Sequence, residues 1–99
     1  MVHEKIQLSH KQADGYVIPL GPLNLVSIAT DVGMAGCGAF DITALEKFDY
    51  PAVRVKATGK NLITTTEDLL TGEVKEANYQ AAKLGIIVGM SGKEALDLM

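Results

Sequence analysis

The sequence contains no tryptophan, one cysteine and one arginine, and each scarcity excludes a class of protein. The single thiol, Cys37, excludes an internal disulfide and a metal site made only of cysteines, and it is consistent with a reducing compartment. The lysines are scattered between Lys5 and Lys93, and Arg54 is the only arginine. Because phosphate binding needs clustered basic residues, we expect no nucleic acid partner and no anionic membrane partner.

Long hydrophobic runs are also missing. The longest mostly apolar stretch, residues 17–30, is interrupted by Pro19, Gly21 and Pro22, and it is too short to span a bilayer. Residues 1–10 lack the apolar central region of a signal peptide. We therefore expect a cytoplasmic protein that does not interact with membranes.

The chain is small and apolar. Its 99 residues are enough for one domain, residues 1–99, and 47% of them are hydrophobic although only 5% are aromatic. A chain of this size and composition often completes its core against a copy of itself. Composition alone leaves a well-packed monomer of small aliphatic side chains as an equal alternative.

Alternating apolar and polar residues predict strands in the first half of the chain. Turn signals at Asp14-Gly15 and Gly21-Pro22 separate the first three strands. Pro19 cannot donate to a sheet ladder, so its strand should lie at an edge or contain a bulge. We expect strands over residues 2–9, 16–20, 23–30, 34–40 and 52–58, with residues 62–63 as a further extension of the sheet.

Capping residues predict helices mainly in the second half. Asp41 fits an N-cap, and two pairs fit the capping box, Thr64 with Glu67 and Ser91 with Glu94. These signals predict helices over residues 42–48, from the Thr64 cap to residue 70, and from the Ser91 cap to about residue 98.

The longest helix is expected over residues 74–84, where apolar residues form one stripe and Gly85 follows as a C-terminal cap. Strands before helices favour an α+β domain over a doubly wound parallel one. The predicted fold is therefore α+β (mixed α/β), with a mixed sheet, a β-rich N-terminal half and two or three helices mostly in the C-terminal half.

One glycine-rich segment, residues 30–41, is the candidate site. Cys37 is the candidate catalytic nucleophile, because its glycine neighbours allow close approach and a following helix N-terminus can activate a thiol. Asp31 and Asp41 are candidate catalytic orienting groups. The alternative is a buried Cys37 that only packs, and it is favoured because two aspartates would raise the pKa of a nearby thiol.

The glycines of this segment, Gly33, Gly36 and Gly38, are candidate ligand-binding residues. Their order does not fit the dinucleotide-binding fingerprint, and the chain has no P-loop. His3 and His10 lie an odd number of residues apart, so on one strand they would face opposite sides and share no metal. We therefore expect neither a cofactor nor a metal.

Four runs of residues occur in a characteristic order: Thr30-Asp31-x-Gly33, Cys37-Gly38-Ala39-x-Asp41, Thr66-Glu67-Asp68-Leu69-Leu70 and Leu84-Gly85-Ile86-x-x-Gly89-Met90-x-Gly92-x-Glu94-Ala95-Leu96. With these runs the chain resembles the YunC-like family of small bacterial and archaeal domains of unknown function. The resemblance covers most of the chain beyond residue 25. It implies an N-terminal β region, about residues 1–30, that mediates tetramerisation, and an α/β body, about residues 31–99; it implies no activity.

Three functional hypotheses follow. The first is a homo-oligomeric, tetrameric binding or scaffold domain of the cytoplasm, which binds copies of itself and a ligand that the sequence does not identify. The second is a small enzyme that uses Cys37 as its nucleophile. The third is a regulatory or structural subunit of a larger complex.

Overall fold

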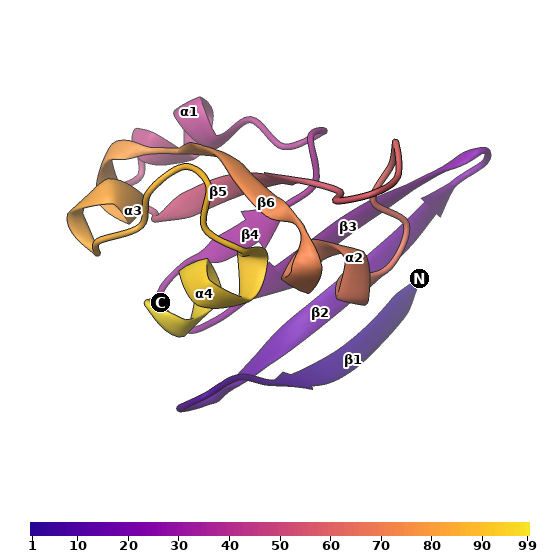
Figure 1. Ribbon diagram of the computed structural model, residues 1–99, viewed down its shortest axis with the longest axis horizontal. Helices are drawn as coiled ribbons and strands as arrows, with labels where there is room; N and C mark the ends of the chain where they lie inside the picture. Colours follow the sequence, from indigo (N-terminus) through magenta and orange to yellow (C-terminus); the bar gives the residue numbers. More distant parts are fainter.

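The protein folds around one six-stranded sheet with four short helices, as the computed structural model shows for residues 1–99 (Figure 1). The strands lie in the sheet in their order along the chain. All neighbouring strands are antiparallel except β4 and β5, which are parallel, so the sheet is mixed. The strands are β1 (Val2–Gln7), β2 (Gln12–Leu20), β3 (Leu23–Ala29), β4 (Met34–Gly36), β5 (Ala52–Lys56) and β6 (Glu73–Ala77).

The helices are five or six residues long, and most lie late in the chain. With the β-rich N-terminal half, this arrangement confirms the predicted α+β class. None of the helices has the length and apolar character needed to cross a membrane. The helices are α1 (Ile42–Glu46), α2 (Thr66–Thr71), α3 (Tyr79–Lys83) and α4 (Gly92–Asp97).

One face of the sheet, here named the inner face, packs against α2 and α4 (Figure 1). Val26, Ile28 and Val53 point to this side and are fully buried, as is Leu69 of α2. They belong to one cluster of 18 buried residues that extends from β1 to the end of the chain. A Cβ on Gly92 would collide with the Leu69 carbonyl oxygen, so α2 and α4 can approach this closely only because position 92 is glycine.

The opposite side of the sheet, the outer face, has much less cover. Successive residues of a strand point to opposite faces, so residues that precede or follow an inner-face residue in the sequence lie on the outer face. Here α1 covers Met34 and Ala52 with Ile42, and these three form a separate small buried cluster. On β2 and β3 the outer-face residue Ile18 is partly exposed and belongs to neither cluster, whereas Leu25 beside it is partly exposed and packs against the main cluster.

The predicted strands β1, β3 and β5 are confirmed, but the turn predicted at Asp14-Gly15 is wrong. The chain reverses earlier, at the Leu8–Lys11 turn, and Gly15 lies inside β2 opposite Glu4. A Cβ on Gly15 would come within 2.9 Å of the Thr66 methyl group. The glycine therefore serves a close contact with α2 rather than a turn.

The long helix predicted over residues 74–84 is also wrong. Residues 73–77 form β6, which pairs with β5, and only Tyr79–Lys83 are helical. Asn78 divides them: its side chain caps α3, and its backbone N–H donates to the Ala52 carbonyl at 3.1 Å. Residues 74–84 do have apolar residues at helical spacing, but residues 73–77 pair with the otherwise free edge of β5 and become a strand.

The ends of several elements differ from prediction by smaller amounts. Strand β4 stops at Gly36 instead of residue 40, and residues 62–63 lie outside the sheet. The capping box before α2 begins one residue later than predicted, with Thr65 as the cap and Asp68 as its partner. The predicted Asp41 cap and the Ser91–Glu94 capping box are confirmed.

The spacing of residues 42–48 predicts that Leu45 and Phe48 face inward. Helix α1 ends at Glu46, and Phe48 is 79% exposed. Leu45 is half-buried and packs against the cluster of the fully buried Ile42, so the prediction is confirmed for Leu45 and wrong for Phe48.

Candidate functional site

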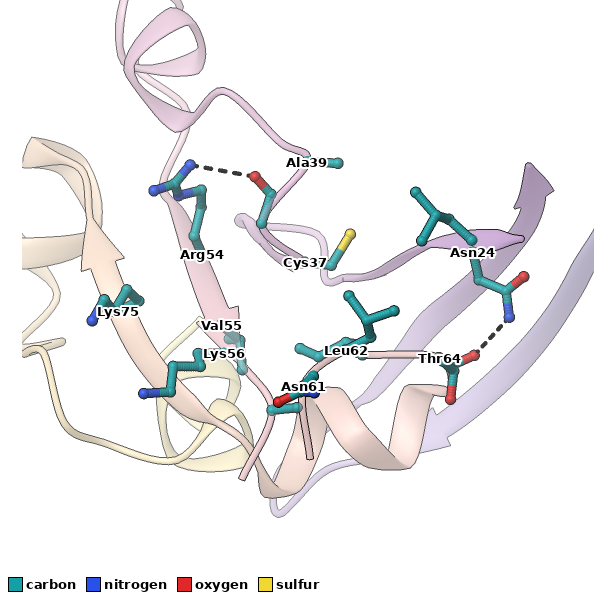
Figure 2. Close-up of a pocket in the computed structure, with 14 residues that line it drawn as sticks. Asn24, Cys37, Ala39, Arg54, Val55, Lys56, Asn61, Leu62, Thr64 and Lys75 are labelled. Carbon is teal, nitrogen blue, oxygen red and sulfur yellow. Dashed lines mark hydrogen bonds between the residues drawn. The ribbon is translucent and has the colours of Figure 1, made fainter. Parts of the chain in front are cut away.

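A gap in the sheet forms the main pocket of the protein, with a volume of about 400 Å³ (Figure 2). Strand β4 lies between β3 and β5 for only three residues. After Cys37, whose N–H donates to the Val26 carbonyl at 3.1 Å, the chain turns away from the sheet. The first residues of β3 and the last residues of β5 therefore border an open space. Its lining consists of Leu23, Asn24, Cys37, Gly38, Ala39, Arg54, Val55, Lys56, Ala57, Asn61, Leu62, Ile63, Thr64 and Lys75.

Residues 61–64 close one side of this gap, because they cross from the end of β5 toward β3. The Asn24 side-chain amide donates to the Thr64 carbonyl at 3.0 Å, which ties this crossing segment to β3 (Figure 2). Asp68 of α2 holds the segment from the other side by accepting from the Thr64 N–H at 3.0 Å and from Lys60 Nζ at 3.0 Å. The Thr64 N–H, and then Lys60, hold the pKa of the Asp68 carboxyl well below its usual range.

Arg54 separates this pocket from a smaller neighbouring hollow of about 230 Å³. Its Nη1 donates to the Gly38 carbonyl at 3.3 Å, and its Nη2 pairs with Glu76. The Arg54 Nε is buried and has no hydrogen-bond partner. The arginine thus connects the Cys37–Ala39 turn to β5 and β6, and part of its hydrogen-bonding capacity is unused.

Two lysines line the β5–β6 side of the pocket. A bulge in β6 leaves Lys75 without a partner residue on β5, at the step between Arg54 and Val55, whereas Lys56 lies opposite Glu73. Neither lysine forms a salt bridge. Figure 2 shows both ammonium groups on the outer side of this wall, away from Cys37. Because the lining includes no Asp, Glu or His, the charges that line the pocket are all positive.

Cys37 is buried in the main apolar cluster and also lines the pocket. Figure 2 shows its sulfur pointing into the space between Ala39 and Leu62. The lining offers the thiol no histidine or carboxylate that could serve as a general base. The arrangement directs a thiol into the pocket and places no activating group beside it.

The two candidate aspartates lie outside this lining. Asp31 is exposed and accepts a hydrogen bond from Lys11 Nζ at 2.7 Å, which holds the pKa of its carboxyl below its usual value. Asp41 borders the smaller hollow, where its carboxylate accepts from the Ala44 N–H at 3.0 Å as the cap of α1. The structure therefore does not bring either aspartate together with Cys37 in the main pocket, and their catalytic roles stay predictions.

The three candidate glycines have different surroundings. Gly38 is exposed and lines both the pocket and the smaller hollow. Gly33 is packed so closely against Pro51 that a Cβ would collide with its carbonyl oxygen, and Gly36 is covered by the Phe40 ring. Of these glycines, only Gly38 has a position from which it can contact a ligand in the pocket.

The sequence analysis did not identify the three basic residues that line the pocket, Arg54, Lys56 and Lys75. Arg54 and Lys56 alternate with buried valines in a strand that was predicted correctly, so their shared face was available as a signal. Lys75 was assigned to a helix, and its position beside Lys56 arises only from the pairing of β6 with β5. No group of three or more His, Cys, Asp or Glu side chains is arranged to hold a metal ion.

Comparison with known proteins places this fold in a family. Residues 36–99 match the family described as "Domain of unknown function (DUF1805)". The chain belongs to this family. It is 38% identical over 81 residues to the uncharacterized protein YunC of Bacillus subtilis, a match that covers 80% of this chain and 77% of YunC. The resemblance to YunC-like proteins is thereby confirmed.

A solved structure extends the likeness to the N-terminal strands. The crystal structure of TA1206, a protein of unknown function from Thermoplasma acidophilum, superposes with a TM-score of 0.85 at 28% identity. The match covers 97% of this chain and 89% of TA1206. Although the DUF1805 match begins at residue 36, the preceding strands therefore also belong to the shared fold.

Proposed function

We propose that this DUF1805 chain is a homo-oligomeric, tetrameric binding domain of the cytoplasm. Its pocket between β3 and β5 binds a small molecule that has an apolar body and an anionic group. Assembly uses the open outer face of β1–β3.

The single observation that carries the binding proposal is a pocket of ligand size with an apolar lining and only positive charges. Its volume of about 400 Å³ lies within the range of small-molecule sites. Leu23 and Leu62, both about half exposed, offer apolar contact area, while Lys56 and Lys75 form no salt bridge, although Glu73 lies opposite Lys56 across the strand pair. An anionic ligand would satisfy these lysines without removing an existing ion pair.

The outer face of the N-terminal strands supports the assembly proposal. Ile18 and Leu25 are neighbours across β2 and β3, and Leu20 and Leu23 beside them are 54% and 50% exposed. Ile18, Leu20 and Leu23 belong to neither buried cluster, and Leu25 is only partly buried against the main one. An apolar sheet face of this kind is typical of an interface between copies.

The binding proposal can be tested by thermal denaturation with amphipathic probes. Octanoate and hexyl phosphate should raise Tm in a saturable way, whereas octylamine should not, because the lining is cationic. The Lys56→Gln/Lys75→Gln double variant should lose most of this response. Lys83→Gln, on an exposed lysine far from the lining, is the matched control and should keep it. A protein whose Tm responds to neither anion would contradict the proposal.

The assembly proposal is tested by the mass of the protein in solution. Light scattering should give a tetramer for the wild type and a smaller species for Ile18→Lys, because a charge is placed at the centre of the open face. A wild-type monomer, or a variant that remains fully tetrameric, would exclude this interface.

Cys37 supports a second candidate function, a small enzyme with a thiol nucleophile, because the sulfur is directed into the pocket. The rate of iodoacetamide alkylation as a function of pH measures its activation. Rapid alkylation with an apparent pKa below about 7 would support the enzyme, and modification only after denaturation would exclude it.

A further inference from the structure

The pocket has a strand edge on each of two opposite sides. In β3, the Val26 carbonyl accepts from Cys37 N–H on the side of β4. Alternate residues of a strand direct their backbone groups to the same side, so Asn24 directs its N–H and carbonyl into the gap that β4 has left. The edge of β3 from Leu23 to Leu25 therefore lacks a neighbouring strand on the side of the pocket.

The edge of β5 follows the same rule. The Pro51 carbonyl accepts from Met34 N–H on the β4 side at 3.0 Å, whereas the Ala52 carbonyl accepts from Asn78 on the β6 side. Val55 and Ala57 therefore direct their backbone groups toward β4 and, beyond its end, into the gap. Neither Asn24 nor Ala57 has a loop hydrogen bond that occupies its backbone N–H.

The spacing of the two edges fits one extended chain. Adjacent strands lie about 4.8 Å apart, so β3 and β5, which both neighbour β4, are separated by roughly 10 Å. The free edge of β3 is three residues long, or about 10 Å at a rise of ~3.3 Å per residue. A segment of three extended residues occupies such a space with backbone hydrogen bonds to both sides.

We propose that the ligand of this pocket is a short extended peptide that lies where β4 would continue. It pairs antiparallel with β3 and parallel with β5, and so completes the interrupted part of the sheet. This proposal rests on the proposed binding function and specifies the chemical class of its ligand. The lining of the pocket then determines which side chains the peptide should carry: apolar ones against the apolar residues and an acidic one near the lysines.

The register predicts where an acidic side chain belongs. Gly36 lies opposite Arg54, so a peptide residue two positions further along lies opposite Lys56 and points to the same outer face. A glutamate there reaches the Lys56 ammonium group, with Lys75 beside it.

The position opposite Val55 is taken by Cys37 itself, so the acidic residue comes first in the peptide. The next peptide residue lies opposite Ala57 and points to the other side, toward Ile63, where an apolar side chain fits. The expected pattern is therefore an acidic residue followed by an apolar residue.

The test is an amide NMR titration with the capped peptide acetyl-Glu-Val-Val-amide and two analogues. In one analogue glutamate is replaced by glutamine, and in the other the backbone amides are N-methylated. We expect the Asn24 and Ala57 amide signals to shift, a Kd at least about tenfold weaker for the N-methylated peptide, and a Kd several-fold weaker for the glutamine peptide. In Lys56→Gln the preference for glutamate should disappear, and in Lys83→Gln it should remain.

The outcomes separate this proposal from the function on which it rests. Saturable binding of octanoate without binding of the peptide, or equal affinity for the methylated and unmethylated peptides, would overturn the peptide proposal and leave the binding function intact. Absence of binding by octanoate, hexyl phosphate and the peptide would overturn both. Tighter binding of uncapped than of capped Glu-Val-Val would support the proposal with free peptides as the source, and the reverse would support it with a segment of a larger protein.

Discussion

The two faces of the sheet are stabilised in different ways. On the inner face, α2 and α4 cover a continuous cluster of 18 buried residues. On the outer face, one helix of five residues, α1, covers a cluster of three, and the rest of the face carries the pocket and the open surface of β2 and β3. The difference indicates that the inner face determines the fold and leaves the outer face free to bind.

Hydrogen bonds replace apolar packing where the outer face is covered. The buried Asn78 side chain accepts from the Ala52 N–H at 3.1 Å and donates to the Ile42 and Tyr50 carbonyls at 3.1 and 2.8 Å. It also caps α3 by accepting from Ala81 N–H. One polar side chain thus fixes α1, β5 and α3 relative to one another, which a three-residue apolar cluster is too small to do.

The comparison predicts its largest effect at the inner face. Leu69→Ala should lower the free energy of unfolding by about 3 kcal/mol, because it removes a fully buried side chain between the sheet and α4. Leu25→Ala on the outer face should cost only about 1 kcal/mol, since that side chain is partly exposed. Urea denaturation of both variants, with the oligomeric state held the same, measures the contrast; equal losses would refute it.

The next largest effect is expected at the polar connection. Asn78→Ala should destabilise the protein by about 2 kcal/mol, because several buried backbone groups lose their partner. Asn61→Ala, at an exposed position, is the matched control and should change stability little. Hydrogen exchange should show selective loss of protection in α1. A uniform loss of protection across the whole sheet would mean that Asn78 does not act mainly by holding α1 on the outer face.

A smaller effect is expected at the segment that closes the pocket. Asp68→Asn should lower stability at pH 7 by about 1 kcal/mol, because the capping box of α2 and the anchor of Thr64 are weakened. The pKa of Asp68 is lowered on folding, so its stabilisation is present above the ordinary value of 3.8 and is lost as the pH falls below it. The variant should therefore show a weaker acid dependence below about pH 4 in denaturation midpoints; an unchanged dependence would contradict the role.

The smallest effect is expected at Phe48, just beyond α1. Phe48→Ser should change the free energy of unfolding by less than about 0.5 kcal/mol, because the ring is 79% exposed. The same denaturation measurement tests it. A loss above about 1 kcal/mol would mean that the outer face has apolar cover that involves this ring.

Local signals predicted the elements whose ends are determined by nearby residues. Alternation identified β1, β3 and β5, and side-chain caps identified the starts of α1 and α4. The segment 74–84 failed because a helical spacing of apolar residues cannot show that β5 offers a free edge. Tertiary pairing, which no local pattern records, decided that segment.

The candidate site was predicted only in part for the same reason. Cys37 and Gly38 were identified from local composition, and they do line the pocket. The pocket itself exists because β4 ends while β3 and β5 continue, a relation among three strands that are distant in sequence. Asn24 joins Cys37 in the pocket lining only through that relation, and Lys75 joins it only through the pairing of β6 with β5.

The order of the strands also has a consequence for how the molecule assembles itself from the extended chain. Because each strand lies beside its neighbours in sequence, β1, β2 and β3 can form as successive hairpins that close only short loops. The parallel pairing of β4 with β5 must instead wait until the long crossover through α1 has closed. We expect pulsed hydrogen exchange during refolding to show protection in β2 and β3 before β5, so that the rim of the pocket on β3 is in place before its opposite rim.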